Sequence, residues 1–88
     1  MWRVTGTGDK NCTLKTWHWR DPIRITRSHI EGRGGSAKGR VSGDGSFKII
    51  VQSKDVGTFT GAFRGDSGDG SFTWSNDGCS GAFVLKRL

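Results

Sequence analysis

Apolar positions recur with a period of two along most of the second half of the chain. Within residues 47–52 the predicted inward positions are Phe47, Ile49 and Val51. Successive side chains of a β-strand point to opposite faces, so this pattern predicts strands with one buried and one solvated face. The same period assigns shared inward faces to Phe59, Gly61 and Phe63, to Phe72 and Trp74, and to Cys79, Gly81, Phe83 and Leu85.

The first half of the chain shows the same period less regularly. One short strand is expected before a turn at residues 6–9, a second within residues 12–19, and a third within residues 23–32. No segment has the 3.6-residue period of a helix. Seven or eight short, hairpin-connected strands predict an all-β single domain over residues 1–88, a small antiparallel barrel or sandwich. In this half, Trp2 and Val4 belong to the first strand, and Ile23 and Ile25 share one face of the third.

Two segments, residues 43–63 and 69–83, follow one plan. Each contains Asp-Gly-Ser-Phe, a short apolar run, a turn and a final Gly-Ala-Phe. Turn residues followed by alternating apolar residues predict one β-hairpin per segment, with the Gly-Asp-Gly turn ahead of its first strand. Gly61 and Gly81 occupy corresponding inward positions, which predicts bends or close approach of neighbouring backbones.

The two cysteines, Cys12 and Cys79, bear on stability and on location. Only 32% of the residues are hydrophobic, so the core is expected to be thin and to need a staple. A disulfide is favoured, and it would tie the second strand to the last; two buried free thiols are the alternative. A disulfide would place the protein in the periplasm or outside the cell. No signal-peptide pattern follows Met1, which leaves a cytoplasmic location as the alternative.

Positive charge is concentrated in the first half of the chain. Residues 1–40 hold nine Lys and Arg against three acids and so account for the whole net charge of +6, while residues 41–88 hold five of each. This asymmetry favours an anionic partner, such as a glycan, a nucleic acid or a membrane surface, although charge can also simply keep a small domain dissolved. No apolar run reaches the ~18 residues of a transmembrane segment, and a monomer is expected.

One stretch, residues 15–27, combines tryptophans with basic side chains. Trp17 and Trp19 would point to the same side of a strand and form a stacking platform, with arginines nearby to hold phosphate or sulfate. Residues Cys12, Leu14 and Thr16 occupy the other parity, so both sets can face inward only across a bulge. The alternative is that the two tryptophans are core residues of a chain with few apolar side chains. The candidate binding residues are Lys15, Trp17, His18, Trp19, Arg20, Arg24 and Arg27.

The segment 64–72, RGDSGDGSF, contains the Gly-Asp-Ser-Gly string of trypsin-like nucleophiles and the Arg-Gly-Asp of integrin ligands. A trypsin-like site needs a histidine base, an orienting carboxylate and a much larger scaffold. Turn chemistry explains the string better, because glycine supplies positive φ and Asp and Ser bond the local backbone. We therefore predict a hairpin turn, no catalytic residue, no metal site and no cofactor.

The order of several short motifs resembles small exported bacterial β-barrel proteins. The motifs are the early NC at 11–12, IEG at 30–32, GRVSGDGSF at 39–47, GTFTGAF at 57–63, a second GDGSF at 68–72 and the late GCSGAFVLKR at 78–87. The resemblance covers most of the chain and implies an exported, disulfide-linked β-barrel. It carries over no catalytic residue.

Three functions are compatible with these patterns. The favoured one is a small non-enzymatic binding module, exported, that binds an anionic polymer or envelope component through the basic first half and the Trp17–Trp19 pair. The second is an intracellular single-stranded nucleic-acid binder on an OB-like barrel, for which no RNP or cold-shock motif is present. The third is an inhibitor or structural protein that acts through protein contact.

Overall fold

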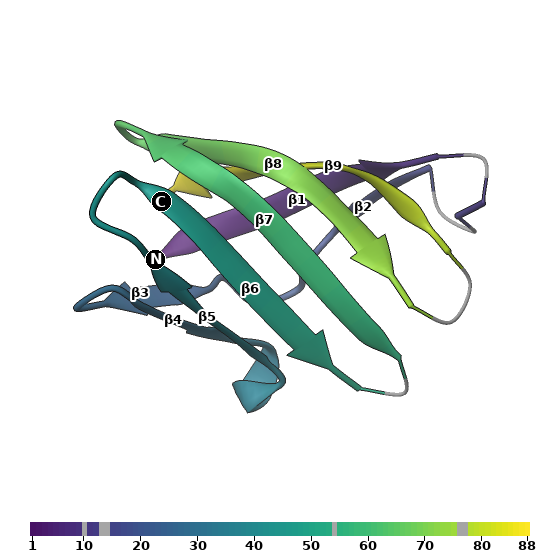
Figure 1. The fold of residues 1–88 in the computed structure, drawn as a ribbon, viewed down its shortest axis with the longest axis horizontal. Coiled ribbons are helices and arrows are strands. Elements are labelled where there is room, and N and C mark those ends of the chain that lie inside the picture. The colour runs from purple at the N-terminus through teal and green to yellow at the C-terminus, as the bar shows by residue number, and fades with distance from the viewer. Residues whose placement is uncertain (10, 13–14, 54, 76–77) are drawn as a thin grey trace.

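Nine β-strands and one short 3-10 helix make up the secondary structure of the computed structural model, which describes residues 1–9, 11–12, 15–53, 55–75 and 78–88 (Figure 1). No helix among these residues is long and apolar enough to cross a membrane. The elements are β1 (Trp2–Gly8), β2 (Thr16–His18), β3 (Arg24–Thr26), β4 (His29–Gly32), η1 (Arg33–Gly35), β5 (Ala37–Val41), β6 (Ser46–Gln52), β7 (Val56–Arg64), β8 (Ser67–Trp74) and β9 (Ser80–Arg87).

All nine strands belong to one antiparallel sheet in the order β2-β1-β9-β8-β7-β6-β5-β4-β3. The sheet curls into a half-barrel, and β4 and β5 fold under β6 (Figure 1). Ile23, directly before β3, exchanges two backbone hydrogen bonds of 2.9 and 2.8 Å with Trp2 of β1. The chain between β2 and β3 therefore runs from one margin of the sheet to the other.

The prediction of an all-β, antiparallel, hairpin-connected fold is confirmed, but the sheet has nine strands instead of seven or eight and forms a half-barrel instead of a barrel or sandwich. One error lies at residues 6–9, which we expected to form a turn. Strand β1 continues to Gly8, because Gly6 and Thr7 pair with β2 on one side and with β9 on the other. Position 6 favours glycine, because the Trp17 indole occupies the space that a side chain at this position would need.

The core lies on the concave face of the sheet, and the predicted parity is confirmed. Phe47, Ile49 and Val51 are buried, as are Phe59 and Phe72, whereas the neighbours Lys48 and Gln52 are exposed. The remaining members of the buried cluster come from β1, β4, β5 and β9 and from the position before β3. These are Val4, Ile23, Ile30, Ala37, Phe83 and Leu85.

Inward aromatic residues are paired across the strands with glycines. The register sets Phe47 against Gly61 and Phe72 against Gly81. A glycine leaves its neighbour's ring room to lie flat against the backbone, which is how aromatic residues compensate for glycine in a strand. The other pairs of this kind are Trp17–Gly6, Phe63–Gly68, Phe83–Gly70 and Trp74–Gly57. The close approach expected at Gly61 and Gly81 is confirmed, since a Cβ at either would overlap a neighbouring carbonyl oxygen.

The two similar segments form the β6–β7 and β8–β9 hairpins, but the turn of the second was misplaced. The string SGDGSF at residues 42–47 does make a turn, in which Gly45 has a φ of +92° and Asp44 accepts hydrogen bonds from Ser46. The same string at residues 67–72 lies inside β8. Its turn comes earlier, at Gly65, whose φ of +65° suits the first central position of a two-residue hairpin.

Cys12 and Cys79 form the predicted disulfide, with Cα atoms 4.7 Å apart. We expected the bridge to tie the second strand to the last, and it does not. Cys12 lies in the connection between β1 and β2, and Cys79 directly precedes β9, so the disulfide fastens the ends of two strands that are already neighbours. The Asp9 carboxylate supports this connection, because it accepts hydrogen bonds from Ser80 Oγ (2.8 Å) and from the Asn11 backbone N–H (2.9 Å).

These hydrogen bonds make stability depend on pH. The Ser80 hydroxyl lowers the pKa of Asp9 below its usual 3.8, and the Ser46 hydroxyl lowers the pKa of Asp44 in the same way. A lowered pKa in the folded state adds stability that is fully present above the unfolded pKa and is lost as the pH falls through the folded pKa. We expect the urea concentration at the unfolding midpoint to decrease once the pH falls below about 4, where the carboxyl groups of the unfolded chain take up protons.

Matched variants separate this effect from general acid unfolding. Asp9→Asn and Asp44→Asn should be less stable than the wild type at neutral pH and should approach it in acid. Asp69→Asn is the control, because Asp69 accepts no side-chain hydrogen bond from the described part of the chain. An equal pH profile for all three variants would contradict the assignment.

Candidate binding surface

The Trp17 and Trp19 side chains lie on the inner side of the curled sheet. Their rings stack at a centroid distance of 6.2 Å with 26° between the planes. Trp17 meets Phe72 edge-on at 5.2 Å, and Trp19 meets Phe59 at 5.3 Å. Both indoles are half-buried and pack against the core. The pair therefore contributes packing area to the core while both indoles remain partly exposed.

The parity conflict around this pair has a simple structural solution. Thr16 is exposed, and Trp17 on the opposite side of β2 faces the core. Cys12 is buried, but it lies in the connection before β2 and does not share the face of that strand. Leu14, the third residue of the competing set, lies outside the described residues.

The other predicted binding residues are divided between two regions of the surface. Lys15, His18 and Arg20 are exposed next to β2, where His18 lies opposite Thr5 of β1. Arg24 projects outward from β3, and Arg27 lies in the turn between β3 and β4. The structure thus separates the tryptophans, which face inward, from the cations, which face outward.

The outer faces of β4, β5 and β6 carry a row of basic side chains that were not named individually as candidates from the sequence, although two of them belong to its basic first half. His29 pairs with Arg40, and Arg40 pairs with Lys48. All three are exposed. Directly opposed side chains of an antiparallel pair have Cβ atoms about 4.5–5.5 Å apart. The alternation around Ile30, Val41 and Phe47 could have marked these residues as outward, but nothing local in the sequence shows that they adjoin one another.

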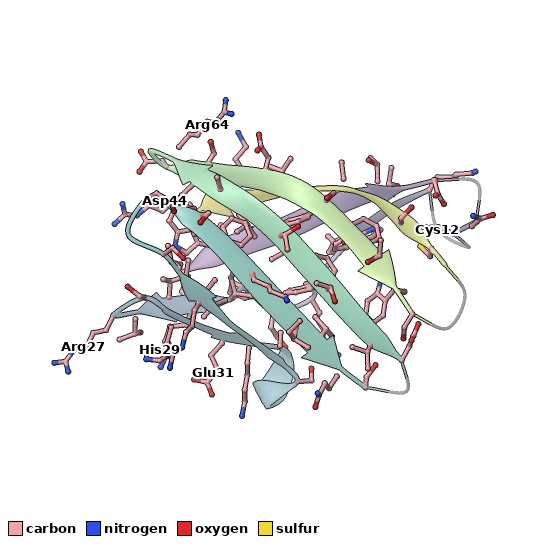
Figure 2. All side chains as sticks on the ribbon, viewed as in Figure 1. Cys12, Arg27, His29, Glu31, Asp44 and Arg64 are labelled. Atoms are coloured by element: carbon pink, nitrogen blue, oxygen red, sulfur yellow. A yellow bond between two sulfur atoms is a disulfide. The ribbon has the colours of Figure 1, made fainter. Side chains whose placement is uncertain are left out.

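A second row runs beside the first and contains one acid. Arg24 pairs with Glu31, and Glu31 pairs with Lys38. Arg24, Thr26, His29, Glu31 and Lys38 line a surface depression whose floor includes Ile30 and Gly39. His29 and Glu31 project to the same side of β4 (Figure 2). We call Arg24, His29, Lys38, Arg40 and Lys48 the basic surface.

The turn that leads into this surface has an unusual backbone. Arg27 and Ser28 have φ values of +49° and +71°, and they are the non-glycine residues with positive φ among those described. Two positive φ values suit a type I′ hairpin turn, a conformation in which Asn and Gly are preferred. The turn extends the Arg27 side chain away from the sheet (Figure 2).

The predicted turn within residues 64–72 forms at Gly65 and Asp66, between β7 and β8, and not at the Ser-Gly-Asp-Gly string that we expected to make it. The Ser67 hydroxyl donates to the Arg64 carbonyl oxygen at 3.4 Å, a local turn contact. Arg87 donates a hydrogen bond to the Asp66 carboxylate at 3.4 Å and forms an ion pair with it, with both side chains well exposed. Within the described residues, no cluster of three or more His, Cys, Asp and Glu side chains forms a possible metal site.

Comparisons with known proteins add no relative to this description. No family model, no curated protein and no solved structure gives a match to the chain.

Proposed function

We propose that the protein is a non-enzymatic binding module whose basic surface holds an anionic polymer of the cell envelope, a glycan that carries sulfate or phosphate groups. The disulfide between Cys12 and Cys79 supports an exported location, since such bonds persist in oxidising compartments. In this proposal the tryptophan pair packs against the core and supports the strands, while the basic surface makes the main contact with the ligand.

The row His29–Arg40–Lys48 carries the proposal. Like charges placed directly opposite each other destabilise a sheet. Arg40 and Lys48 are such a pair, and neither forms an ion pair with another described residue. A bound anion would relieve this repulsion, because it places negative charge between the two cations.

The spacing of the basic surface suits a repeating ligand. Neighbouring strands lie about 4.8 Å apart, and alternate residues of a strand about 6.6–6.8 Å apart. Arg40 and Lys38 are alternate residues of β5, so the two rows present cations at both spacings. Glu31 lies between Arg24 and Lys38 and can accept hydrogen bonds from sugar hydroxyls.

A glycan is favoured over single-stranded nucleic acid by the absence of a stacking partner. Sequence-tolerant binding of single strands relies on aromatic side chains that stack on bases. The basic surface contains no Phe or Trp, and Trp17 and Trp19 pack on the other side of the sheet. A single-stranded oligonucleotide is therefore the comparison ligand of the test.

The variant Lys48→Thr tests the proposal with two opposite readouts. We expect its affinity for a sulfated oligosaccharide to fall about three- to tenfold, as for the loss of one charge-assisted contact. Its urea stability should rise by a few tenths of a kcal/mol, because the repulsion with Arg40 is removed. Titrations are followed by NMR at physiological salt.

Lys86→Thr is the matched control, because it removes one exposed lysine from β9, outside the basic surface. It should bind the oligosaccharide within about twofold of the wild type at a salt concentration that screens distant charges. Equal losses for both variants would show that only net charge matters. Tighter binding of the oligonucleotide, with shifts at the Trp17 and Trp19 indoles, would favour the nucleic-acid alternative.

A further inference from the structure

A surface depression at one end of the half-barrel has four apolar side chains in its lining. Trp2, Ile25, Val41 and Phe63 line a depression there together with Ser28 and Arg87, and we call these six residues the apolar mouth. The ring centroids of Trp2 and Phe63 are 4.9 Å apart. The four apolar side chains pack against the core on one side and remain partly exposed on the other.

Each of the six mouth residues has a Lys or Arg as an immediate neighbour in the chain, and none has an Asp or Glu. Neighbouring residues of a strand point to opposite faces, so five of these cations lie on the outer face of the strands around the mouth, and Arg27 extends from the turn between β3 and β4. All six cations are exposed. This cationic collar consists of Arg3, Arg24, Arg27, Arg40, Arg64 and Lys86.

The collar draws on most of the strands that meet at this end. Arg64 ends β7, Arg27 lies at the tip of the β3–β4 hairpin, and both project from the end of the molecule opposite Cys12 (Figure 2). The molecule measures 33 × 22 × 22 Å, so the collar is distributed over an end wider than a single headgroup. Asp66, which pairs with Arg87, is an acid beside it.

We propose that the apolar mouth and its cationic collar dock on an anionic lipid surface, an interaction beyond the polymer binding proposed above. Tryptophan is preferred at the membrane–water interface, and exposed Lys and Arg are attracted to anionic headgroups. A charged polymer would not bury the apolar side chains at the centre of the mouth, whereas a lipid surface offers apolar area beneath a layer of anions. Several cations around one mouth fit a surface with many headgroups better than one bound amphiphile.

A double variant at the collar tests the proposal against general charge. Arg64→Gln with Lys86→Gln removes two collar cations that do not belong to the basic surface, and Lys38→Gln with Lys48→Gln removes two of the basic surface that do not belong to the collar. Binding is measured by co-sedimentation with phosphatidylcholine vesicles that contain phosphatidylglycerol. We expect the collar variant to lose about 30-fold in partitioning and the second variant less than about threefold.

The position of the contact is read from the indole signals. In nanodiscs that contain a spin-labelled lipid, the Trp2 indole should broaden strongly and the Trp74 indole, which belongs to β8 and pairs with Gly57, should not. Retained oligosaccharide binding by the collar variant would separate this inference from the polymer proposal.

Four results would overturn the inference, and the first three concern vesicles and nanodiscs. These are equal loss of vesicle binding by both double variants, broadening of Trp74 in place of Trp2, and binding of neutral phosphatidylcholine vesicles as tight as that of anionic ones. Saturation of Trp2 by a short-chain alkyl phosphate without vesicles, with no binding to vesicles, would equally reject a lipid surface.

Discussion

Replacing Cys12 and Cys79 together by alanine is expected to lower the free energy of unfolding by about 4 kcal/mol, because the disulfide closes a long loop in the unfolded chain. The sequence separation of the two residues is 67, which covers most of the domain. A domain of this size is only marginally stable without such a constraint. We therefore expect the double variant to be largely unfolded at 37 °C.

Urea unfolding of the wild type with and without a reductant measures the same quantity independently. The reduced wild type should match the double variant, and intact mass should show two hydrogens fewer in the oxidised protein. In the folded fraction of the variant we expect the Asp9–Ser80 hydrogen bond of the wild type to hold the β1–β2 connection against β9. Identical midpoints for oxidised wild type and double variant would mean that the bridge adds no stability.

The variant Gly70→Ala is expected to destabilise the protein by about 3 kcal/mol through overpacking. A Cβ at this position would overlap the Thr60 carbonyl oxygen and lie 2.6 Å from the Gly61 Cα. Both atoms belong to the backbone of β7, which cannot move aside without breaking its pairing with β6 or β8. The glycine is required by the close approach of two strands and not by a special backbone angle.

Gly43→Ala is the matched control, because no atom lies within 4 Å of a Cβ there and Gly43 is not among the residues with positive φ. Its stability should stay within about 0.5 kcal/mol of the wild type. Urea midpoints at equal slope compare the two variants. A Gly70→Ala protein as stable as the wild type would show that β7 and β8 are not in close contact at this point.

The inward faces of the long strands were predictable from the sequence. Phe47, Ile49, Val51, Phe59 and Phe72 follow a period of two, and the structure buries all five. This pattern is local, since each strand must cover one face of the sheet whatever its partner is. The short strands β2 and β3 were harder to delimit, because three residues hold their conformation only through a neighbouring strand.

The basic surface could be recognised only from the register of the sheet. His29, Arg40 and Lys48 come from three strands, and a shift of one residue in either pairing would separate them. The Trp17–Trp19 pair was recognised from the sequence as one unit. Its orientation stayed open until the structure placed Cys12 outside β2 and both indoles against Phe59 and Phe72.

The string SGDGSF adopts two different conformations in this chain, so tertiary structure determines which one forms. Its composition determined that the chain can turn there, and at residues 42–47 it does. At residues 67–72 the turn forms earlier, at Gly65, and the same six residues extend into β8 between β7 and β9. Glycine can adopt both the turn and the strand conformation. At residues 67–72 the packing of Gly68 beneath Phe63 and of Gly70 against β7 selects the strand.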